Sequence, residues 1–331
     1  MNQQIAQSHQ ESAIELAVII NSFNRLLLLR EAISSIIQVL TLTFPNQSAV
    51  VVFDAGSTDG SQEFIEDCAA NTQALHITYL FPSVNIDRSF SAGCNLAVKT
   101  AANKFPQLKW CLFFETDNLI TNPASLLLAV KLLEQEDELA AVGFTVEGAA
   151  FCSRFPKPLA FVLGLQVSHR LGLERMQISR WYPFHNSRWG FSDIVYTSPL
   201  LVRYSAWQAT DGMDTARFPF SDCDSDWCWM VHKKGWRIAV LDVHGVIHDN
   251  RRIQSEWSGQ RVLNFHQARL RLLYKHKGKW IGVLKYILFV RHCLELLILI
   301  LKAIRFEQAK KSLIQRIYLL KTVWQDYTES I

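Results

Sequence analysis

Two carboxylates stand two residues apart at the end of an apolar run. The run is Trp110–Phe114, and Glu115 and Asp117 follow it in the sequence WCLFFETDNLI. A buried strand here would deliver both side chains to the carboxyl end of a sheet, where the ligands of α/β proteins bind. Hard oxygen ligands at this spacing suit Mg²⁺ or Mn²⁺ bound together with the phosphates of a substrate. An ordinary polar loop after a strand is the alternative interpretation.

Polar residues also follow two earlier apolar runs. Leu16–Ile20 is short and β-branched, and it ends in the hydrogen-bonding segment Asn21–Arg25. Ala49–Phe53 delivers Asp54, and the small residues of Ala55–Ser61 then allow a tight turn and a helix cap. A strand, a sharp polar turn and a helix, repeated along a chain, indicate a parallel doubly wound sheet.

The remaining spacing predicts the elements that position these side chains. Apolar residues at helical intervals predict a helix over Arg25–Leu40, and the sequence predicts a third strand at His76–Leu80. A helix is expected over Asn95–Lys104, and Gly93 before it suits a place where the backbone approaches a ligand or another helix closely. Neither a GxGxxG nor a GxxxxGKS/T motif is present. A nucleotide bound here would therefore depend on carboxylates and a metal.

Charge is distributed unevenly along the 331 residues. The composition, 49% hydrophobic and 19% charged, is that of a folded chain with ample core material. Residues 251–331 carry 16 Lys/Arg against 5 Asp/Glu, a net charge of +11 that leaves −7 for residues 1–250, since the whole chain carries +4. A basic tail on an acidic body predicts an anionic partner. Because the tail is also very apolar, a membrane surface fits better than nucleic acid.

The cysteines and the N-terminal segment indicate the cellular compartment in which the protein is expected. The seven cysteines are scattered, without the paired spacing of a zinc site. The N-terminal segment lacks the basic start and the cleavable apolar region of a signal peptide. Reduced thiols in a cytoplasmic protein are therefore expected.

Six stretches occur in the order and spacing of a known family. In the first half they are VIINSFNR (18–25), VVFDAGSTDGS (51–61), RSFSAGCNLA (88–97) and FFETDN (113–118), the last at the place of the DxD metal motif. In the second half they are PLLVRYSAWQATDGMD (199–214) and SDCDSDWCWMVHKKGWRIAVLDVHGVIHDN (221–250). Together they resemble the family 2 glycosyltransferases, the nucleotide-sugar-dependent enzymes of the GT-A fold, over about residues 14–250.

The resemblance implies a donor site at the ends of the first strands. Asp54 would hold the base or the ribose of the nucleotide. The other expected donor-binding residues line the same pocket: Ser22, Asn24, Gly93 and Asn95.

The resemblance also implies a metal and a general base. Asp117 would bind a divalent Mn²⁺ or Mg²⁺ between the two phosphates, with Glu115 as the first acid of the motif and His248, after a predicted strand at Val243–Ile247, as a further ligand. Asp224 would be the general base. Its motif departs from the family pattern because Cys223 replaces the usual glutamate, and a register shifted by two residues would make Asp226 the base instead.

These expectations define an architecture and an activity. The fold class is α/β, a GT-A-type doubly wound, mostly parallel sheet flanked by helices over residues 14–250. Its nucleotide-sugar half is 14–120, its acceptor and catalytic half is 121–250, and 251–331 form a basic, apolar, helical and membrane-associating extension. The implied enzyme is an inverting hexosyl- or deoxyhexosyltransferase, similar to the rhamnosyltransferase-like enzymes of bacterial envelope polysaccharides. It would move the sugar of a UDP-, dTDP- or GDP-sugar to a glycan or a lipid-linked acceptor.

Two other functions remain open. A nucleotidyltransferase that makes sugar nucleotides shares the α/β architecture, but that class begins with a Gly-rich phosphate loop, which NSFNR is not. A non-catalytic relative could bind a glycan or a partner subunit at the membrane if the altered Cys223–Asp224 pair does no chemistry. Residues 150–198 match no known motif, and their aromatic residues and arginines suit either an acceptor site or ordinary packing.

The extension divides into two predicted helical segments. Residues 251–279 are basic and amphipathic, and residues 280–304 are mostly apolar. The polar residues of the second segment fall on one side of a helix: Lys285, Arg291, His292, Glu295 and Lys302. Whether this segment spans a bilayer stays open, but a helix lying in the membrane face explains both features over residues 251–305. We expect a peripheral protein on the inner face of the plasma membrane; packing on the catalytic domain or in a homodimer is the alternative.

Overall fold

The computed structural model describes two compact parts of the chain. The described residues are 14–72, 75–163, 178–248, 259–278, 282–306, 310, 313–314 and 316–318. The first unit is Met1–Arg154 with Gln177–Ile253, and the second is Phe155–Met176 with Gln254–Ile331. Each unit is described by itself below.

One sheet organises the first unit. Its order among the described residues is β3-β2-β1-β4-β12-β6-β13-β10-β9, and β7 pairs with β6 beside this path. Its strands are β1 (Leu16–Ser22), β2 (Ser48–Asp54), β3 (His76–Leu80), β4 (Trp110–Phe113), β6 (Leu139–Val146), β7 (Ala149–Ala150), β9 (Tyr182–Phe184), β10 (Ser187–Ser192), β12 (Leu200–Arg203) and β13 (Arg237–Asp242).

The sheet is mixed and mostly parallel in its first half. Strands β3, β2, β1 and β4 run parallel, so their carboxyl ends meet at one edge. Strand β12 lies antiparallel between β4 and β6, and β13 runs parallel to β6. The predicted mostly parallel sheet flanked by helices is confirmed.

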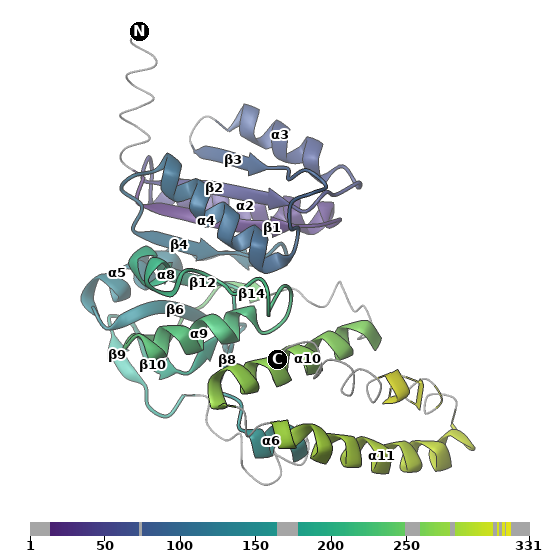
Figure 1. Ribbon diagram of the computed structural model, residues 1–331. Helices are drawn as coiled ribbons and strands as arrows, with labels where there is room; N and C mark the ends of the chain where they lie inside the picture. The colour runs from purple at the N-terminus through teal and green to yellow at the C-terminus, as the bar shows by residue number, and fades with distance from the viewer. Residues whose placement is uncertain are drawn as a thin grey trace. The chain divides into compact units, whose positions relative to one another are not determined.

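Helices cover both faces of this sheet (Figure 1). They are α2 (Leu26–Thr43), α3 (Ser61–Asn71), α4 (Phe90–Lys104), α5 (Pro123–Gln135), α8 (Tyr204–Thr210) and α9 (Cys223–Lys233). Side chains alternate along a strand, and Val18 and Val50 share one core with the buried residues of α2 and α5. On the opposite face, Phe53 contacts α4 at Gly93, and the Phe113 ring lies 4.8 Å from that of Trp207 in α8.

Two predicted elements have different bounds. The helix expected from Asn95 begins at Phe90, because the Ser89 side chain accepts a hydrogen bond from the Ala92 amide and caps it there. The single strand expected at Val243–Ile247 is wrong. Strand β13 ends at Asp242, the chain turns through Gly245 (φ +80°), and β14 (Val246–His248) pairs with β5 (Asn118–Ile120) instead. Strands β8 (Cys152–Ser153) and β11 (Ile194–Val195) form another short pair.

Helix α2 is the one helix, among the described residues, that is long and apolar enough to cross a membrane. Core helices of globular domains also meet this criterion. Here seven α2 residues are buried and pack in the core of the first unit: Leu28, Leu29, Ala32, Ile33, Ile36, Val39 and Leu40.

The second unit has its own small core. Its helices are α6 (Pro158–Leu163), α10 (Gly259–Lys277) and α11 (Leu284–Ala303), and its buried cluster is Val162, Leu270, Leu273, Leu284 and Leu288. The predicted helix over 251–279 corresponds to α10, although 251–258 and 279 lie outside the described residues. Trp280 and Ile281, at the start of the predicted apolar segment, also lie outside them.

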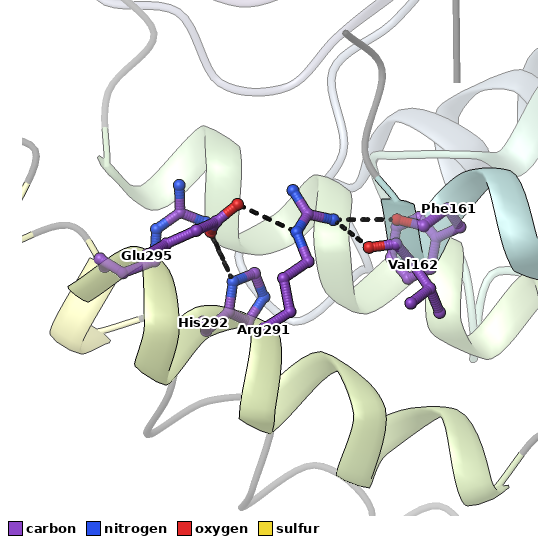
Figure 2. A network of polar contacts seen from close by, with 6 residues as sticks. Phe161, Val162, Arg291, His292 and Glu295 are labelled. Carbon is purple, nitrogen blue, oxygen red and sulfur yellow. Dashed lines mark hydrogen bonds and ion pairs between the residues drawn. The ribbon is translucent and has the colours of Figure 1, made fainter. Parts of the chain in front are cut away.

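The charged side chains near the middle of α11 turn inward (Figure 2). Arg291 donates to the carbonyl oxygens of Phe161 (3.2 Å) and Val162 (2.6 Å) at the end of α6, and to Glu295 (2.9 Å). His292 is fully buried, with Nδ1 3.2 Å from Glu295. Burial opposes ionisation of Glu295, but the His292 hydrogen bond and the guanidinium groups of Arg316 and Arg291 outweigh it and lower its pKa to about 2. The charge of Glu295 is therefore balanced within the unit by Arg291 and Arg316.

Most large apolar side chains of α11 face outward instead, whereas Leu284 and Leu288 are buried in the core. Large exposed ones occur along the whole helix and just beyond it: Tyr286, Ile287, Phe289, Val290, Leu294, Leu297, Ile298, Ile300, Leu301, Ile304 and Phe306. We call this set the α11 apolar face. The sequence predicted that Arg291, His292 and Glu295 share one side, and the structure directs that side into the unit. Lys302 is exposed, and the side chain of Lys285 is not described.

Candidate active site

The candidate site begins where β1 and β2 end side by side. Ser22 and Asp54 are register partners in this parallel pair, and the Ser22 carbonyl accepts a hydrogen bond from Ala55. Both side chains are buried. The Ser22 hydroxyl forms no hydrogen bond within the described part of the chain. A buried hydroxyl without a partner at a strand end is a free recognition group for a ligand.

Asp54 organises the turn that follows it. One carboxylate oxygen accepts hydrogen bonds from the amides of Gly56 (3.0 Å) and Ser57 (2.7 Å) and from the Gln62 side chain (2.9 Å). The other accepts from the Ser57 hydroxyl at 2.6 Å. These bonds fix the AGSTDGS turn. The predicted contact of Asp54 with a nucleotide stays a prediction.

Asn24 locks this turn to the end of β1. It adopts a left-handed conformation (φ 50°), its amide donates to the Ser57 hydroxyl (2.8 Å), and its side-chain oxygen accepts from the Thr58 amide (2.8 Å). The amide of Leu26, the first residue of α2, donates to Asp59 at 2.9 Å. Two loops 33–34 residues apart thus form one hydrogen-bonded rim at the carboxyl ends of β1 and β2.

Gly93 and Asn95 position α4 against this rim. A Cβ at Gly93 would lie 2.5 Å from Asn21 Oδ1 and 2.6 Å from the Phe53 ring, so this glycine permits the close approach of α4 to β1 and β2. The Asn95 side chain donates to the Met213 carbonyl (2.8 Å) and accepts from the Met213 amide (2.9 Å). Both atoms of this amide therefore hold the loop before α9; their predicted place in a nucleotide pocket stays a prediction.

Asp117 and His248 meet at the carboxyl end of β4. Asp117 is only 4% exposed, and its Oδ1 lies 3.4 Å from His248 Nδ1. The β14–β5 pairing sets His248 directly opposite Asn118, which brings these residues together from 130 positions apart. Asp117 Oδ1 forms no hydrogen bond with any residue that the structure describes.

Asn118 determines which ring nitrogen of His248 carries the proton. Its side-chain oxygen accepts from the Glu115 amide at 2.8 Å, so its NH₂ group faces His248 Nδ1 at 2.9 Å. This assignment makes Nδ1 an acceptor and places the proton on Nε2. The single electron pair of Nδ1 is then taken up by the Asn118 NH₂ group, while Asp117 Oδ1, 3.4 Å from Nδ1, accepts no hydrogen bond within the described ranges.

A buried carboxylate oxygen without a hydrogen bond in the described ranges, next to an imidazole ring, fits a divalent cation. A cation that also bound His248 Nδ1 would have to displace the Asn118 NH₂ group from it. Carboxylate oxygen and imidazole nitrogen are common ligands of Mn²⁺-like metals. In the described ranges, no three His, Cys, Asp or Glu side chains form a metal-binding group by themselves. Phosphate oxygens of a substrate would have to complete the coordination, as they do for Mg²⁺ in many nucleotide-binding sites.

Glu115 points to different partners. Its Oε1 accepts a hydrogen bond from the Thr197 hydroxyl at 2.7 Å. It acts electrostatically on Cys94 and Cys223, and Asp224 acts on the same two thiols. Burial, reinforced by these carboxylates, raises the pKa of both cysteines. Glu115 and Asp224 therefore share one acidic neighbourhood, and the predicted contact of Glu115 with a metal stays a prediction.

Helix α9 presents its two acids differently. Asp224 and Asp226 both lie in the first turn, where the helix dipole favours negative charge. Asp224 is half-buried, whereas Asp226 is 1% exposed. Next to them, Trp227 is fully buried and donates to the Thr210 hydroxyl at 2.9 Å. A base must reach its substrate, so accessibility favours Asp224 over Asp226.

Three residues of the site were missed from the sequence. Arg25 lies with Nη1 3.6 Å from Asp117 Oδ2. Asn118 orients His248, and Thr197 binds Glu115. Asn118 directly follows Asp117 in the chain, and Arg25 ends the family-like stretch VIINSFNR, so both had a sequence signal. The contact of Thr197 is long-range and leaves no local pattern.

The aromatic side chains of β9 and β10, before β12, mainly pack against one another. The rings of Tyr182, Trp189 and Phe191 pack against one another in tilted and edge-to-face pairs with centroids 4.8–5.8 Å apart, which matches the packing alternative of the sequence. Beside them is an open cavity of about 490 Å³, with Arg188 and Asp242 among its lining residues. These two side chains form an ion pair at 2.7 Å, so each already has a partner of opposite charge within the cavity lining.

Comparisons with known proteins agree with this architecture. A family model described as "Glycosyltransferase like family 2" matches residues 13–282. A comparison with curated protein sequences found no match.

Two solved structures are similar to the chain. One is the mannosyltransferase PcManGT from Pyrobaculum calidifontis, in complex with GDP-Man and Mn²⁺, at 15% identity and TM-score 0.50, covering 100% of this chain and 95% of that one. The other is GalNAc-T7 with UDP, GalNAc and Mn²⁺, at 10% identity and TM-score 0.51, covering 72% of this chain and 44% of that one. At these identities the likeness shows the fold alone.

Proposed function

The chain belongs to glycosyltransferase family 2, and on this premise we propose that it is an inverting, metal-dependent enzyme that transfers a hexose or deoxyhexose from a nucleotide sugar to a glycan or lipid-linked acceptor. The observation that carries the proposal is the buried Asp117, whose Oδ1 makes no hydrogen bond in the described part of the chain and faces His248 at 3.4 Å. This pair lies at the sheet edge where ligands of α/β folds bind.

The donor nucleotide would lie at the ends of β1 and β2. The rim made by Asn24 and the turn after Asp54 is held rigid by hydrogen bonds, so it can orient a base and ribose without reorganising. The free hydroxyl of Ser22 is available to such a ligand. UDP, dTDP and GDP are the candidate nucleotides.

The donor diphosphate would lie beside Asp117 and His248. These two side chains would hold Mn²⁺ or Mg²⁺, with Glu115 as the first acid of the DxD motif. When bound, the cation supplies positive charge to the leaving diphosphate. Asp117 would contribute the negative charge that holds the cation, and Asn118 holds the His248 ring beside Asp117.

Asp224 would act as the general base, with Asp226 as the alternative. It would take the proton of the acceptor hydroxyl while that oxygen bonds to the anomeric carbon. The bond between this carbon and the diphosphate oxygen breaks, and the nucleoside diphosphate leaves with the electron pair. Such a base contributes about 10²–10⁴ in rate. A single displacement inverts the anomeric configuration.

Calorimetric binding of UDP, dTDP and GDP to the full chain tests the proposal. Each nucleotide is titrated with Mn²⁺ and then with EDTA. We expect one nucleotide to bind, and EDTA to weaken its binding by at least about tenfold, because the phosphates need the cation to approach Asp117. If folded protein binds none of the three, the transferase proposal is wrong and a non-catalytic glycan-binding or scaffold role takes its place.

We further propose that the second unit attaches the enzyme to the inner face of the plasma membrane from the cytoplasm. The support is the orientation of α11. Arg291 and Glu295 pair inside the unit, while the α11 apolar face points outward. The net charge of +11 on residues 251–331 complements anionic lipid headgroups. A helix with such an apolar side lies in the membrane interface.

Vesicle binding measures this attachment. The chain is sedimented with phosphatidylcholine vesicles that contain or lack phosphatidylglycerol, and we expect tighter binding to the anionic vesicles. Leu301→Gln should weaken binding by about tenfold, because a leucine that is 70% exposed in water loses its burial in lipid. Leu42→Gln changes a leucine of similar exposure (65%) in α2 of the first unit and should bind as the wild type does.

Light scattering of the same variants tests the alternative partner. If Leu301→Gln converts a homodimer into a monomer and leaves vesicle binding unchanged, a second subunit covers the α11 apolar face and the membrane proposal is wrong. If Leu301→Gln and Leu42→Gln weaken vesicle binding equally, the attachment does not involve α11.

A further inference from the structure

Arg25 is the cationic partner of Asp117 in this structure. Its Nη1 lies 3.6 Å from Asp117 Oδ2, and the two side chains are 41% and 4% exposed. A carboxylate buried to this degree needs a counter-charge. Arg25 occupies the same carboxylate that would hold the metal, on the oxygen opposite the one that faces His248.

The backbone of Arg25 is fixed while its side chain reaches into the site. Asn24 is tied to Ser57 and Thr58, and the Leu26 amide donates to Asp59. Arg25 is also the N-cap of α2, whose first turn contains no acidic residue that could bind the guanidinium locally. The guanidinium is therefore held near Asp117 by tertiary structure and is exposed enough to change partner.

We propose that Arg25 couples metal binding to donor binding: it neutralises Asp117 in the empty site and transfers to the nucleoside diphosphate when a divalent cation binds Asp117. A cation at Asp117 and the guanidinium would repel each other if both stayed beside this carboxylate. A diphosphate relieves this repulsion by binding the guanidinium in place of Asp117, because phosphate oxygens accept two parallel hydrogen bonds from a guanidinium. Metal and diphosphate then raise each other's affinity by the same factor. The inference rests on the proposed function.

Titration of Mn²⁺ into the full chain, followed by the electron paramagnetic resonance signal of free Mn²⁺, tests this coupling. The measured quantity is the ratio of the Mn²⁺ dissociation constants without nucleotide and with a saturating concentration of the nucleotide that the wild type binds, UDP, dTDP or GDP. For the wild type we expect a ratio of about 5–150. For Arg25→Gln we expect Mn²⁺ alone to bind about three- to tenfold more tightly, since a repelling charge on a half-exposed side chain is gone. The ratio should then fall at least about fivefold.

Two further variants define what the guanidinium contributes. Arg25→Lys keeps the charge but loses the planar fork, so Mn²⁺ alone should bind as it does to the wild type while the ratio falls. Arg30→Gln removes an exposed arginine one turn along α2, which lies over the Phe64 ring. It should reproduce both wild-type constants, because among the described residues this side chain contacts Phe64 and forms no ion pair with Asp117.

The outcomes separate this inference from the proposed function. If the wild type binds none of UDP, dTDP and GDP in the presence of Mn²⁺, the donor site itself is wrong. If the wild type shows coupling and Arg25→Gln keeps the full ratio, the donor site stands and the role of Arg25 is overturned. Equal weakening of Mn²⁺ binding with and without nucleotide in Arg25→Gln would also overturn it, because a purely structural role predicts that result.

Discussion

Replacing Asp117 by asparagine is expected to weaken Mn²⁺-dependent nucleotide binding by at least about 100-fold. The amide keeps the shape of the side chain but loses the negative charge that a divalent cation requires. Loss of an outer-shell partner of a metal ligand already costs about 10–100-fold, and Asp117 would be a ligand itself. Calorimetry of the variant with the nucleotide that the wild type binds measures this effect.

The same variant should remain folded. Asp117 is 4% exposed and Oδ1 has no hydrogen bond in the described ranges, so removing its charge also removes an electrostatic cost. Thermal unfolding followed by circular dichroism checks this expectation. Asp242→Asn is the matched control, because Asp242 is also an arginine-paired carboxylate at the end of a strand. Metal-dependent binding that survives in Asp117→Asn would show that other groups hold the cation.

The second large effect is expected for Asp224→Asn. An amide cannot accept the proton of the attacking hydroxyl, so turnover should fall by about 10²–10⁴ while nucleotide binding stays within about twofold. Slow transfer of the sugar to water, measured as nucleoside diphosphate released from UDP-, dTDP- and GDP-sugars, provides the assay. Loss of one favourable charge at the N-terminus of α9 costs at most about 1 kcal/mol at a half-exposed position, so folding is not at risk.

Asp226→Asn identifies the base between the two candidates. Asp226 is 1% exposed beside the buried Trp227, and we expect its amide variant to lower thermal stability more than turnover per folded molecule. If Asp226→Asn is folded and binds nucleotide but has lost turnover, Asp226 is the general base instead of Asp224. Full turnover in both variants would leave α9 without a catalytic role.

Local patterns of the sequence were sufficient for the fold of the first half of the chain. The apolar runs before Asn21, Asp54 and Glu115 each form a buried strand of the same sheet, as predicted. The turn residues that follow them also form the rim of the candidate pocket. Strand and turn propensities depend on nearby residues, so these elements can be predicted without knowing the rest of the structure.

Long-range pairing determined the parts of the site that the sequence could not give. The residues predicted as a strand before His248 form a turn after β13 and the start of β14, and the pairing of β14 with β5 is what sets His248 beside Asn118 and Asp117. Thr197 reaches Glu115 across 82 positions, and Asn95 reaches Met213 across 118. No local periodicity encodes which distant segment fills such a position, because register and packing of the whole sheet decide it.

The sequence by itself determined the family, the succession of strands and polar turns, and the identity of the acids at the strand ends. The tertiary structure decided which of these acids share partners: Asp117 pairs with His248 and Arg25, whereas Glu115 lies in the neighbourhood of Asp224. It also decided that the charges of α11 turn inward and its apolar face outward. The physical reason is the same in both cases. A residue type fixes what chemistry a side chain can do, but buried charges take the counter-charges and hydrogen bonds that the packed fold places within reach.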